Sequence, residues 1–232
     1  PIPFSRGDLS AAPAPPASPP GGAARPPVTT GFSGRGNGDS YRARRVLRVR
    51  SAKGVALSAS RPDRRDKAAT FAARDNPATF SDYRRLLERK DVTAVFIASP
   101  CDLHVEMAIA ALKAGKHVYC EKPAGVTPES IGELVKVARA SSTVFQIGQQ
   151  MRSMPRLKKL AAKLSEGMLG KIIMMKAQRH AGDDLDHNGP SADWFFNARR
   201  SGDVIVEMAV HNLDVCNWFI RSRPERAAGF GG

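Results

Sequence analysis

The chain has 232 residues, of which 42% are hydrophobic and 25% charged, a composition typical of one large or two small globular domains. Its cysteines, Cys101, Cys120 and Cys216, are too few and too scattered for a disulfide framework or a zinc site, which favours a reducing, cytoplasmic location. No apolar run approaches the roughly 20 residues of a membrane helix, so we expect no membrane partner. Because the chain begins at Pro1 rather than Met, a lost export leader is the alternative.

The net charge of +14 is concentrated in residues 1–90, which carry 18 Lys or Arg against 7 Asp or Glu. Residues 42–53 hold six of these cations, with Tyr41 as their aromatic neighbour. No helix-turn-helix, zinc-finger or RNA-binding motif accompanies them. The pattern therefore favours a solvated basic surface over a nucleic-acid interface.

Residues 1–27 are dominated by Pro, Ala and Gly and are expected to form a disordered tail. The next segment, 28–38, stands where a first strand and a phosphate-binding loop belong, although its threonines and serine make a poor central strand. Gly34 and Gly36 keep the first two glycines of a G-x-G-x-x-G pattern, and Asp39 occupies the third position. A flexible linker is the alternative for this loop.

A second strand is predicted over 55–60, and the residues that follow it select the cofactor in dinucleotide-binding folds. An acidic residue there would bind the ribose 2′-hydroxyl, whereas this chain has Ser60 and Arg61, with Arg64 and Arg65 close behind. This pattern favours the 2′-phosphate of NADP over NAD. The alternative is that the arginines simply begin a helix over 63–74.

Residues 93–125 predict a complete strand, helix, strand unit. Thr93 to Ala98 is a buried strand ended by Ser99-Pro100, residues 103–114 carry one apolar stripe of a helix that Gly115 ends, and 117–120 is a second buried strand. Such a unit implies parallel strands, whose carboxyl ends meet at one crevice. Ser99-Pro100 and Glu121-Lys122-Pro123 both lie at that crevice.

Further along, a helix over 131–140 and a buried strand over 144–148 complete the first domain near residue 149. A helix is expected over 157–164 and a strand of a second domain over 171–179. The polar loop after that strand holds five possible metal ligands, namely His180, Asp183, Asp184, Asp186 and His187. Their spacing fits no recognised site, so no metal is assigned.

Residues 201–220 read as a buried helix that is apolar nearly all round from Val204 onward, with Asp203 placed to cap it. Glu207, His211, Asp214 and Trp218 fall at i, i+4, i+7 and i+11, on one stripe of this helix. Buried ionisable groups must be paired or shifted in pKa, and such groups concentrate in active sites. A core helix with one internally bonded histidine is the alternative.

The Glu121-Lys122-Pro123 turn and the 201–219 helix together resemble the Gfo/Idh/MocA oxidoreductase family, named after glucose-fructose oxidoreductase, inositol dehydrogenase and a rhizopine-catabolism protein. The resemblance implies an α/β fold, with a Rossmann-type doubly wound parallel sheet over 28–149 and the start of a truncated α+β substrate domain over 150–232. We therefore expect a fragment of a longer protein that forms a homo-oligomer when full length.

The resemblance also implies site residues. Lys122 would lie between nicotinamide and substrate, and His211, oriented by Glu207 or Asp214, would take the proton of the reacting alcohol. The cofactor-binding residues would be Gly34, Gly36, Ser60, Arg61, Ser99, Pro100, His104, Glu121, Lys122 and Arg152. His104 has a second interpretation, as a brace for its own helix.

The activity that follows is an NAD(P)-dependent dehydrogenase for a secondary alcohol of a sugar or polyol, with a small carbohydrate-like molecule as its partner. Two alternatives remain open from the sequence. One is an NAD-dependent glycoside hydrolase of the same fold. The other is a non-catalytic sugar or nucleotide sensor, which the weak first strand and Asp39 favour.

Overall fold

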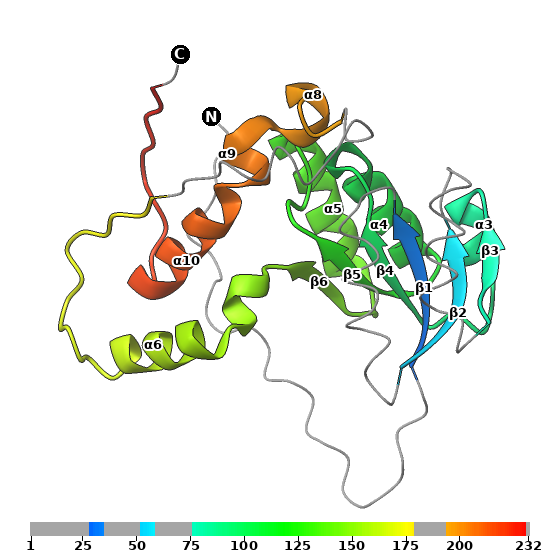
Figure 1. The fold of residues 1–232 in the computed structure, drawn as a ribbon, viewed down its shortest axis with the longest axis horizontal. Helices are drawn as coiled ribbons and strands as arrows, with labels where there is room; N and C mark the ends of the chain where they lie inside the picture. Colours follow the sequence, from blue (N-terminus) through cyan, green and yellow to red (C-terminus); the bar gives the residue numbers. More distant parts are fainter. Residues whose placement is uncertain (1–27, 35–51, 59–75, 179–193, 231–232) are drawn as a thin grey trace, which may run out of the picture.

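The computed structural model describes residues 28–34, 52–58, 76–178 and 194–230, and the expected tail over 1–27 lies outside them. Within the described residues, six parallel strands form one sheet in the order β3-β2-β1-β4-β5-β6 (Figure 1). The strands are β1 (Val28–Gly34), β2 (Ala52–Ser58), β3 (Ala78–Phe80), β4 (Ala94–Ala98), β5 (His117–Glu121) and β6 (Phe145–Gly148). The order reverses direction between β1 and β4, as in a doubly wound Rossmann fold. The predicted fold class is therefore confirmed.

Strand β1 takes the central place despite its polar sequence. Its backbone pairs in parallel with β2 on one side and with β4 on the other, with Thr30 opposite Ala94 and Gly34 opposite Ala98. Backbone pairing on both sides holds the strand in the sheet although few of its residues are apolar, and the β-branched threonines favour extended backbone. The prediction of a first strand at the start of segment 28–38 is confirmed.

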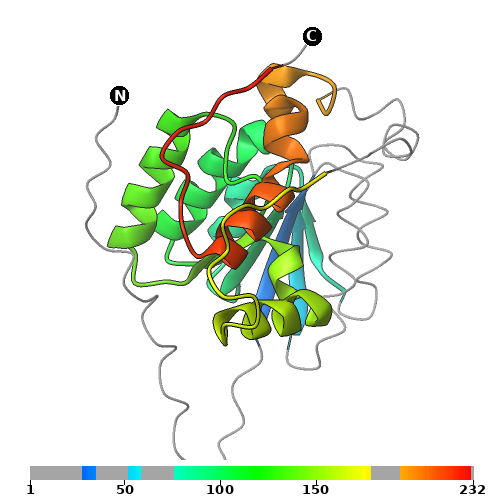
Figure 2. The same ribbon diagram turned by 90° about the vertical axis from the view of Figure 1, so that its left-hand side faces the viewer.

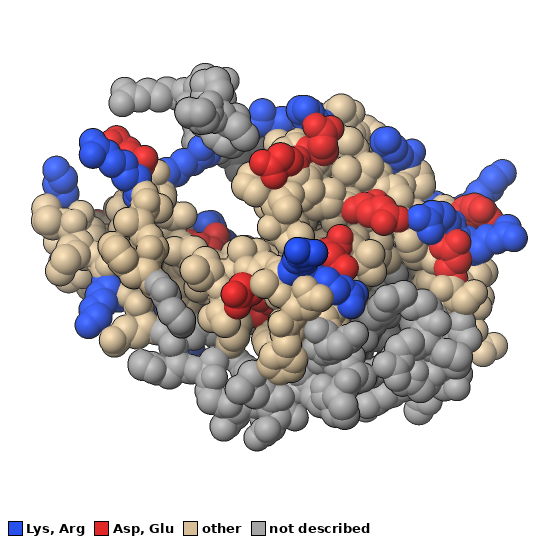
Figure 3. Space-filling model, turned by 90° about the horizontal axis from the view of Figure 1, so that it is seen from above, with Lys and Arg blue, Asp and Glu red and all other residues tan. Residues whose placement is uncertain are grey.

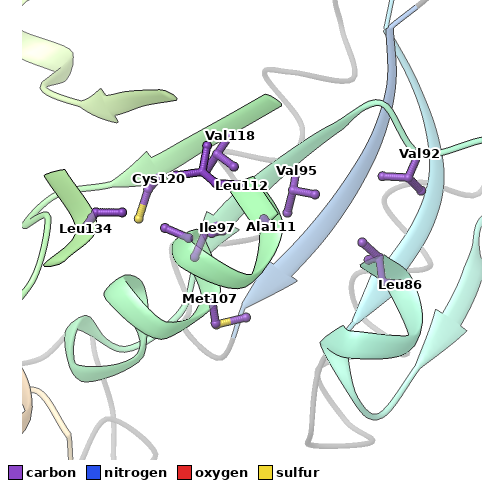
Figure 4. Packing of buried hydrophobic residues seen from close by; sticks show 11 residues of the cluster. Leu86, Val92, Val95, Ile97, Met107, Ala111, Leu112, Val118, Cys120 and Leu134 are labelled. Atoms are coloured by element: carbon purple, nitrogen blue, oxygen red, sulfur yellow. The ribbon is translucent and has the colours of Figure 1, made fainter. Parts of the chain in front are cut away.

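The core of the domain lies between β4, β5 and the helices that connect the second half of the sheet (Figure 4). Helix α4 (His104–Lys113) follows the 3-10 helix η2 (Cys101–Leu103), and α5 (Pro128–Ala140) joins β5 to β6. Alternate strand residues face α4, and Ile97 and Cys120 are both fully buried. The predicted apolar stripe of the helix packs on them. This unit positions the turns that follow β4 and β5 at the carboxyl edge of the sheet.

Two short elements were not predicted: β3 and α3 (Tyr83–Leu87). Strand β3 has three residues and α3 has five, too few for a hydrophobic period to show. The end of α3 is tied to the sheet by Lys116, whose Nζ donates a hydrogen bond to the Arg89 carbonyl over 2.7 Å.

After β6 the chain forms η3 (Gln150–Ser153) and α6 (Pro155–Ser165), and the later helices are α8 (Ala198–Ser201), α9 (Asp203–Glu207) and α10 (Val210–Ile220). The strand predicted over 171–179 is wrong for residues 171–178, which carry no strand. A strand requires a partner, and among the described residues none pairs with this segment. Ile173 and Met174 are accordingly 83% and 84% exposed.

The single helix predicted from Val204 onward is also wrong, because it divides into α9 and α10. In a continuous helix the Glu207 carbonyl would accept the His211 amide. Here the Lys122 ammonium donates to that carbonyl over 2.5 Å, and the amides of Met208 and Ala209 both turn back to the Val204 carbonyl. A side chain from the first domain thus bonds to the backbone at the point where α9 ends.

Burial and capping of this segment differ from the prediction as well. Val204 and Ile205 are 61% and 68% exposed, so α9 is not buried on all its faces, as the prediction of a buried helix required. Helix α9 begins at Asp203 rather than after it, with Gly202 as the N-cap residue. Asp203 has φ of +64°, and its carboxylate accepts a hydrogen bond from the adjacent Val204 amide over 2.6 Å.

Helices α8 and α9 lie beyond the carboxyl ends of the strands, and α6 and α10 pack side by side next to β6 (Figures 1 and 2).

Seen from the α8 side, the described residues carry Lys and Arg interspersed with Asp and Glu (Figure 3). In the described part of the chain, no helix combines the length and apolar character needed to cross a membrane.

Candidate active site

The turns that follow β4 and β5 form the floor of the site, and His104 joins them. Its Nδ1 lies 2.7 Å from the Pro123 carbonyl oxygen and its Nε2 lies 2.9 Å from the Ser99 carbonyl oxygen. The side chain is 1% exposed. His104 therefore braces the two turns through their backbone carbonyls. Both nitrogens of its ring face protein atoms.

The protonation of His104 follows from its surroundings. Burial lowers the pKa of the imidazole below its ordinary value, and the two facing carbonyls oppose this effect in part. A neutral ring donates to one carbonyl at a time. His104 thus lies between the two turns, with one ring nitrogen within hydrogen-bonding distance of each carbonyl.

Lys122 carries the positive charge of the site and is 8% exposed. Its ammonium makes an ion pair with the Glu207 carboxylate and donates to the Glu207 backbone carbonyl over 2.5 Å. The two residues are 85 positions apart in sequence, and the pair joins the β5 turn to the end of α9. A buried charge must be paired, and this arrangement supplies both a charged and a neutral acceptor.

The electrostatic environment extends to Cys101, at the start of η2. Burial raises the pKa of its thiol to about 12, with the Glu207 carboxylate as the next cause and the Lys122 charge opposing it. The thiol is therefore uncharged at neutral pH. Cys101 contributes packing beside the ion pair, not a nucleophile.

His211 and Glu121 are both buried, at 5% exposure each. His211 lies in the first turn of α10, four residues after Glu207. Glu121 ends β5, next to Gly148 on β6, where a Cβ would lie 2.8 Å from the Tyr119 hydroxyl and 3.0 Å from Glu121 Oε2. Glycine at 148 leaves room for these two side chains, which share one face of β5.

Arg152 and Asp214 form a second charged pair, between η3 and α10. Arg152 donates to both carboxylate oxygens of Asp214, over 2.7 and 2.9 Å, in a bidentate geometry. The guanidinium also lies 5.4 Å from the centre of the Trp218 ring. Both carboxylates of the predicted stripe thus pair with cations from other elements: Glu207 pairs with Lys122 after β5, and Asp214 pairs with Arg152 in η3.

The structure therefore brings several predicted residues to one edge of the sheet. Ser99, Pro100, His104, Glu121, Lys122 and Glu207 gather around the β4 and β5 turns, and Gly34 ends the neighbouring strand β1. His211 lies in α10, four residues after Glu207. Gly36, Ser60 and Arg61 lie outside the described residues, as does the polar loop holding His180 and Asp183. Among described residues no group of three or more His, Cys, Asp or Glu is placed to hold a metal.

Gln149, directly after β6, is a site candidate that the sequence did not reveal. Its Oε1 is buried and has no hydrogen-bond partner among the described residues. The signal available in the sequence was its place at the carboxyl end of a strand in a parallel sheet.

Comparison with known proteins agrees with this architecture. Residues 28–149 match the model of an oxidoreductase family with an NAD-binding Rossmann fold, and residues 157–232 match the Gfo/Idh/MocA C-terminal domain. Myo-inositol 2-dehydrogenase from Thermotoga maritima is 26% identical over 152 residues, which are 66% of this chain and 43% of that protein.

Two solved structures are similar over most of the chain. Scyllo-inositol dehydrogenase from Lactobacillus casei, with bound NAD(H) and scyllo-inositol, has a TM-score of 0.71 at 25% identity, covering 83% of this chain and 56% of that one. A 3-ketoreductase from Actinomadura kijaniata, in complex with NADP and TDP-benzene, has a TM-score of 0.67 at 25% identity, covering 84% of this chain and 57% of that one. The chain thus spans about half the length of these relatives. With both domain models matched, the chain belongs to the Gfo/Idh/MocA family of oxidoreductases.

Proposed function

We propose that this protein is an NAD(P)-dependent dehydrogenase that transfers hydride between a secondary alcohol of a sugar or polyol and nicotinamide. The observation that carries the proposal is the Lys122–Glu207 pair, held at the carboxyl edge of a Rossmann sheet, with the buried His211 four residues after Glu207 in the sequence. Relatives named as inositol dehydrogenases support the substrate class.

The residues present fit a nicotinamide dinucleotide. The sheet order reverses between β1 and β4, which is where dinucleotides bind in such sheets, and Gly34 ends β1 at that point. The buried Gln149 Oε1, without a partner among the described residues, offers an acceptor at the same edge. When bound, the nicotinamide ring would supply the hydride acceptor.

Each protein group then has a role set by its chemistry. Lys122, kept in place by the Glu207 carboxylate and carbonyl, would donate to the reacting oxygen and stabilise the developing alkoxide. His211 would take the hydroxyl proton as general base. Arg152, fixed by Asp214 and Trp218, would hold the cofactor side of the crevice.

The test is a cofactor-reduction assay on inositols, anhydro sugars and hexoses with NAD and with NADP, following absorbance of the reduced nicotinamide. A dehydrogenase accumulates reduced cofactor in proportion to the ketone formed. Substrate turnover without net reduced cofactor would instead identify a glycoside hydrolase of the same fold. Cofactor binding with no turnover of any substrate would favour a sensor.

Cofactor preference follows from Ser60 and Arg61 after the second strand, and we infer NADP over NAD. We expect Arg61→Ala to weaken NADP binding by about tenfold or more and NAD binding by much less, since a charge-assisted contact to the 2′-phosphate is lost. Titration calorimetry with both cofactors measures the ratio.

The matched control is Arg85→Ala, which removes an arginine whose side chain is 71% exposed on α3. It should leave both affinities unchanged. Equal losses for NADP and NAD in the Arg61 variant would contradict the preference.

A further inference from the structure

A second ion pair joins the first domain to α8, the helix that directly precedes α9 and its Glu207. Arg200, in α8, donates from Nε to Asp102 Oδ2 over 2.9 Å, and the two side chains are 29% and 26% exposed. Asp102 belongs to η2, directly after the Ser99-Pro100 turn. Its other oxygen, Oδ1, is buried without a hydrogen-bond partner among the described residues, so Arg200 is the described residue that compensates this carboxylate.

The turn from α8 to α9 transmits the position of Arg200 to Glu207. Ser201 is 1% exposed, and its hydroxyl donates to the Asn197 carbonyl and accepts the Asp203 amide over 3.0 Å. Gly202 follows with φ of +78°, and a Cβ there would lie 2.5 Å from the Val206 Cβ. This close approach leaves α9 one packed arrangement relative to α8.

The other end of α9 meets Lys122, and the two contact points on the first domain are themselves joined. His104 links the Ser99 and Pro123 carbonyls, and these lie just before η2 and just after Lys122. These contacts form a closed circuit: Asp102 bonds to Arg200, Arg200 leads through the chain to α9, and α9 bonds to Lys122. His104 connects the turn after Lys122 back to the turn before Asp102. Displacement at one contact is passed to the others.

We propose that Arg200 and Asp102 are positioning residues, which hold Glu207 against Lys122 by anchoring the amino-terminal side of α9 to the β4 turn. The proposal rests on the proposed dehydrogenase function, because it assigns the pair to the geometry of Lys122. Among the described residues, Arg200 and Asp102 bond to each other and Lys122 bonds to Glu207, so the effect of the first pair on the second passes through α8 and α9.

The main test measures the reactivity of Lys122 and requires no turnover. Arg200→Gln is treated with an acetylating reagent, and peptide mass spectrometry follows each lysine over time. We expect Lys122 to acetylate several-fold faster than in the unmodified protein, since displacement of α9 uncovers its ammonium. Lys116 is the internal reference, because it is also 8% exposed and its Nζ is bonded to the Arg89 carbonyl, away from α9. Its rate should not change.

A charge-swapped variant, Asp102→Arg with Arg200→Asp, should restore protection of Lys122. In the activity assay, Arg200→Gln should lower kcat by about tenfold with a much smaller change in KM, since misplaced catalytic groups affect the chemical step. The swapped variant should recover most of this loss. Arg199→Gln, which removes the exposed neighbouring arginine, should match the unmodified protein in both measurements.

Unchanged Lys122 acetylation in Arg200→Gln would overturn the proposal. If Lys116 and Lys122 both become reactive in Arg200→Gln, that variant has unfolded, and the charge-swapped variant decides the question. A Lys122 that stays protected in the charge-swapped variant supports the proposal. A Lys122 that acetylates quickly in it overturns the proposal. If the unmodified protein reduces no cofactor with any substrate, the dehydrogenase function fails. The acetylation of Lys122 still decides whether Arg200 positions α9.

Discussion

Lys122→Ala should lower turnover by about a hundredfold or more, the range for groups that stabilise charge in the transition state. The variant removes the ammonium that is bonded to Glu207 and that would face the developing alkoxide. Steady-state kinetics should show the loss in kcat, with cofactor affinity measured separately by fluorescence titration.

The control for Lys122 is Lys113→Ala, at an exposed position near the end of α4 on the same strand-helix-strand unit. It should keep normal turnover. A near-normal kcat in Lys122→Ala, with a melting curve like that of the unmodified protein, would return the lysine to a purely structural role.

His211→Ala should also reduce turnover by about a hundredfold, because a positioned general base contributes 10²–10⁴-fold in rate. The substitution leaves space at a buried position. If the ring acts as a base, added imidazole should recover part of the lost rate in a concentration-dependent manner. A structural histidine would show no such recovery.

His117→Ala is the matched control for His211. His117 is exposed at the start of β5, where its Nδ1 accepts a hydrogen bond from the Val144 amide over 3.0 Å. Its loss should leave kcat unchanged, with or without imidazole. Normal turnover of His211→Ala itself would contradict the assignment of the base.

The fold could be predicted where local pattern and topology agree. Strands 93–98 and 117–120 are continuous apolar runs on either side of a helix with one apolar stripe, and a parallel unit of this length has one common handedness. That logic placed the Ser99 and Lys122 turns at one edge of the sheet, and the structure has them joined through His104.

The partners of the site residues could not be predicted. The stripe on 207–218 groups Glu207, His211 and Asp214 as neighbours on one helix, and the family resemblance implied that one of the two carboxylates orients the histidine. In the structure the carboxylates pair with Lys122 and Arg152, 85 and 62 positions away in sequence. Periodicity describes one element at a time, and these contacts depend on how α9 packs against the first domain and how α10 packs against η3.

The second domain shows the same limit for backbone structure. The segment 171–178 has the apolar residues of a strand, yet strand formation depends on hydrogen-bonding partners elsewhere in the chain. Among the described residues no strand lies beside it. Local propensity alone did not decide its structure.

The end of α9 has a consequence for how the site can vary. Glu207 presents two acceptors to Lys122, a carboxylate that belongs to the side chain and a carbonyl that belongs to the peptide. A substitution at position 207 can remove the carboxylate, but the peptide carbonyl remains whatever the side chain. Lys122 is therefore held partly by a backbone carbonyl at the end of α9, and this part of its anchorage stays available when the side chain at position 207 is substituted.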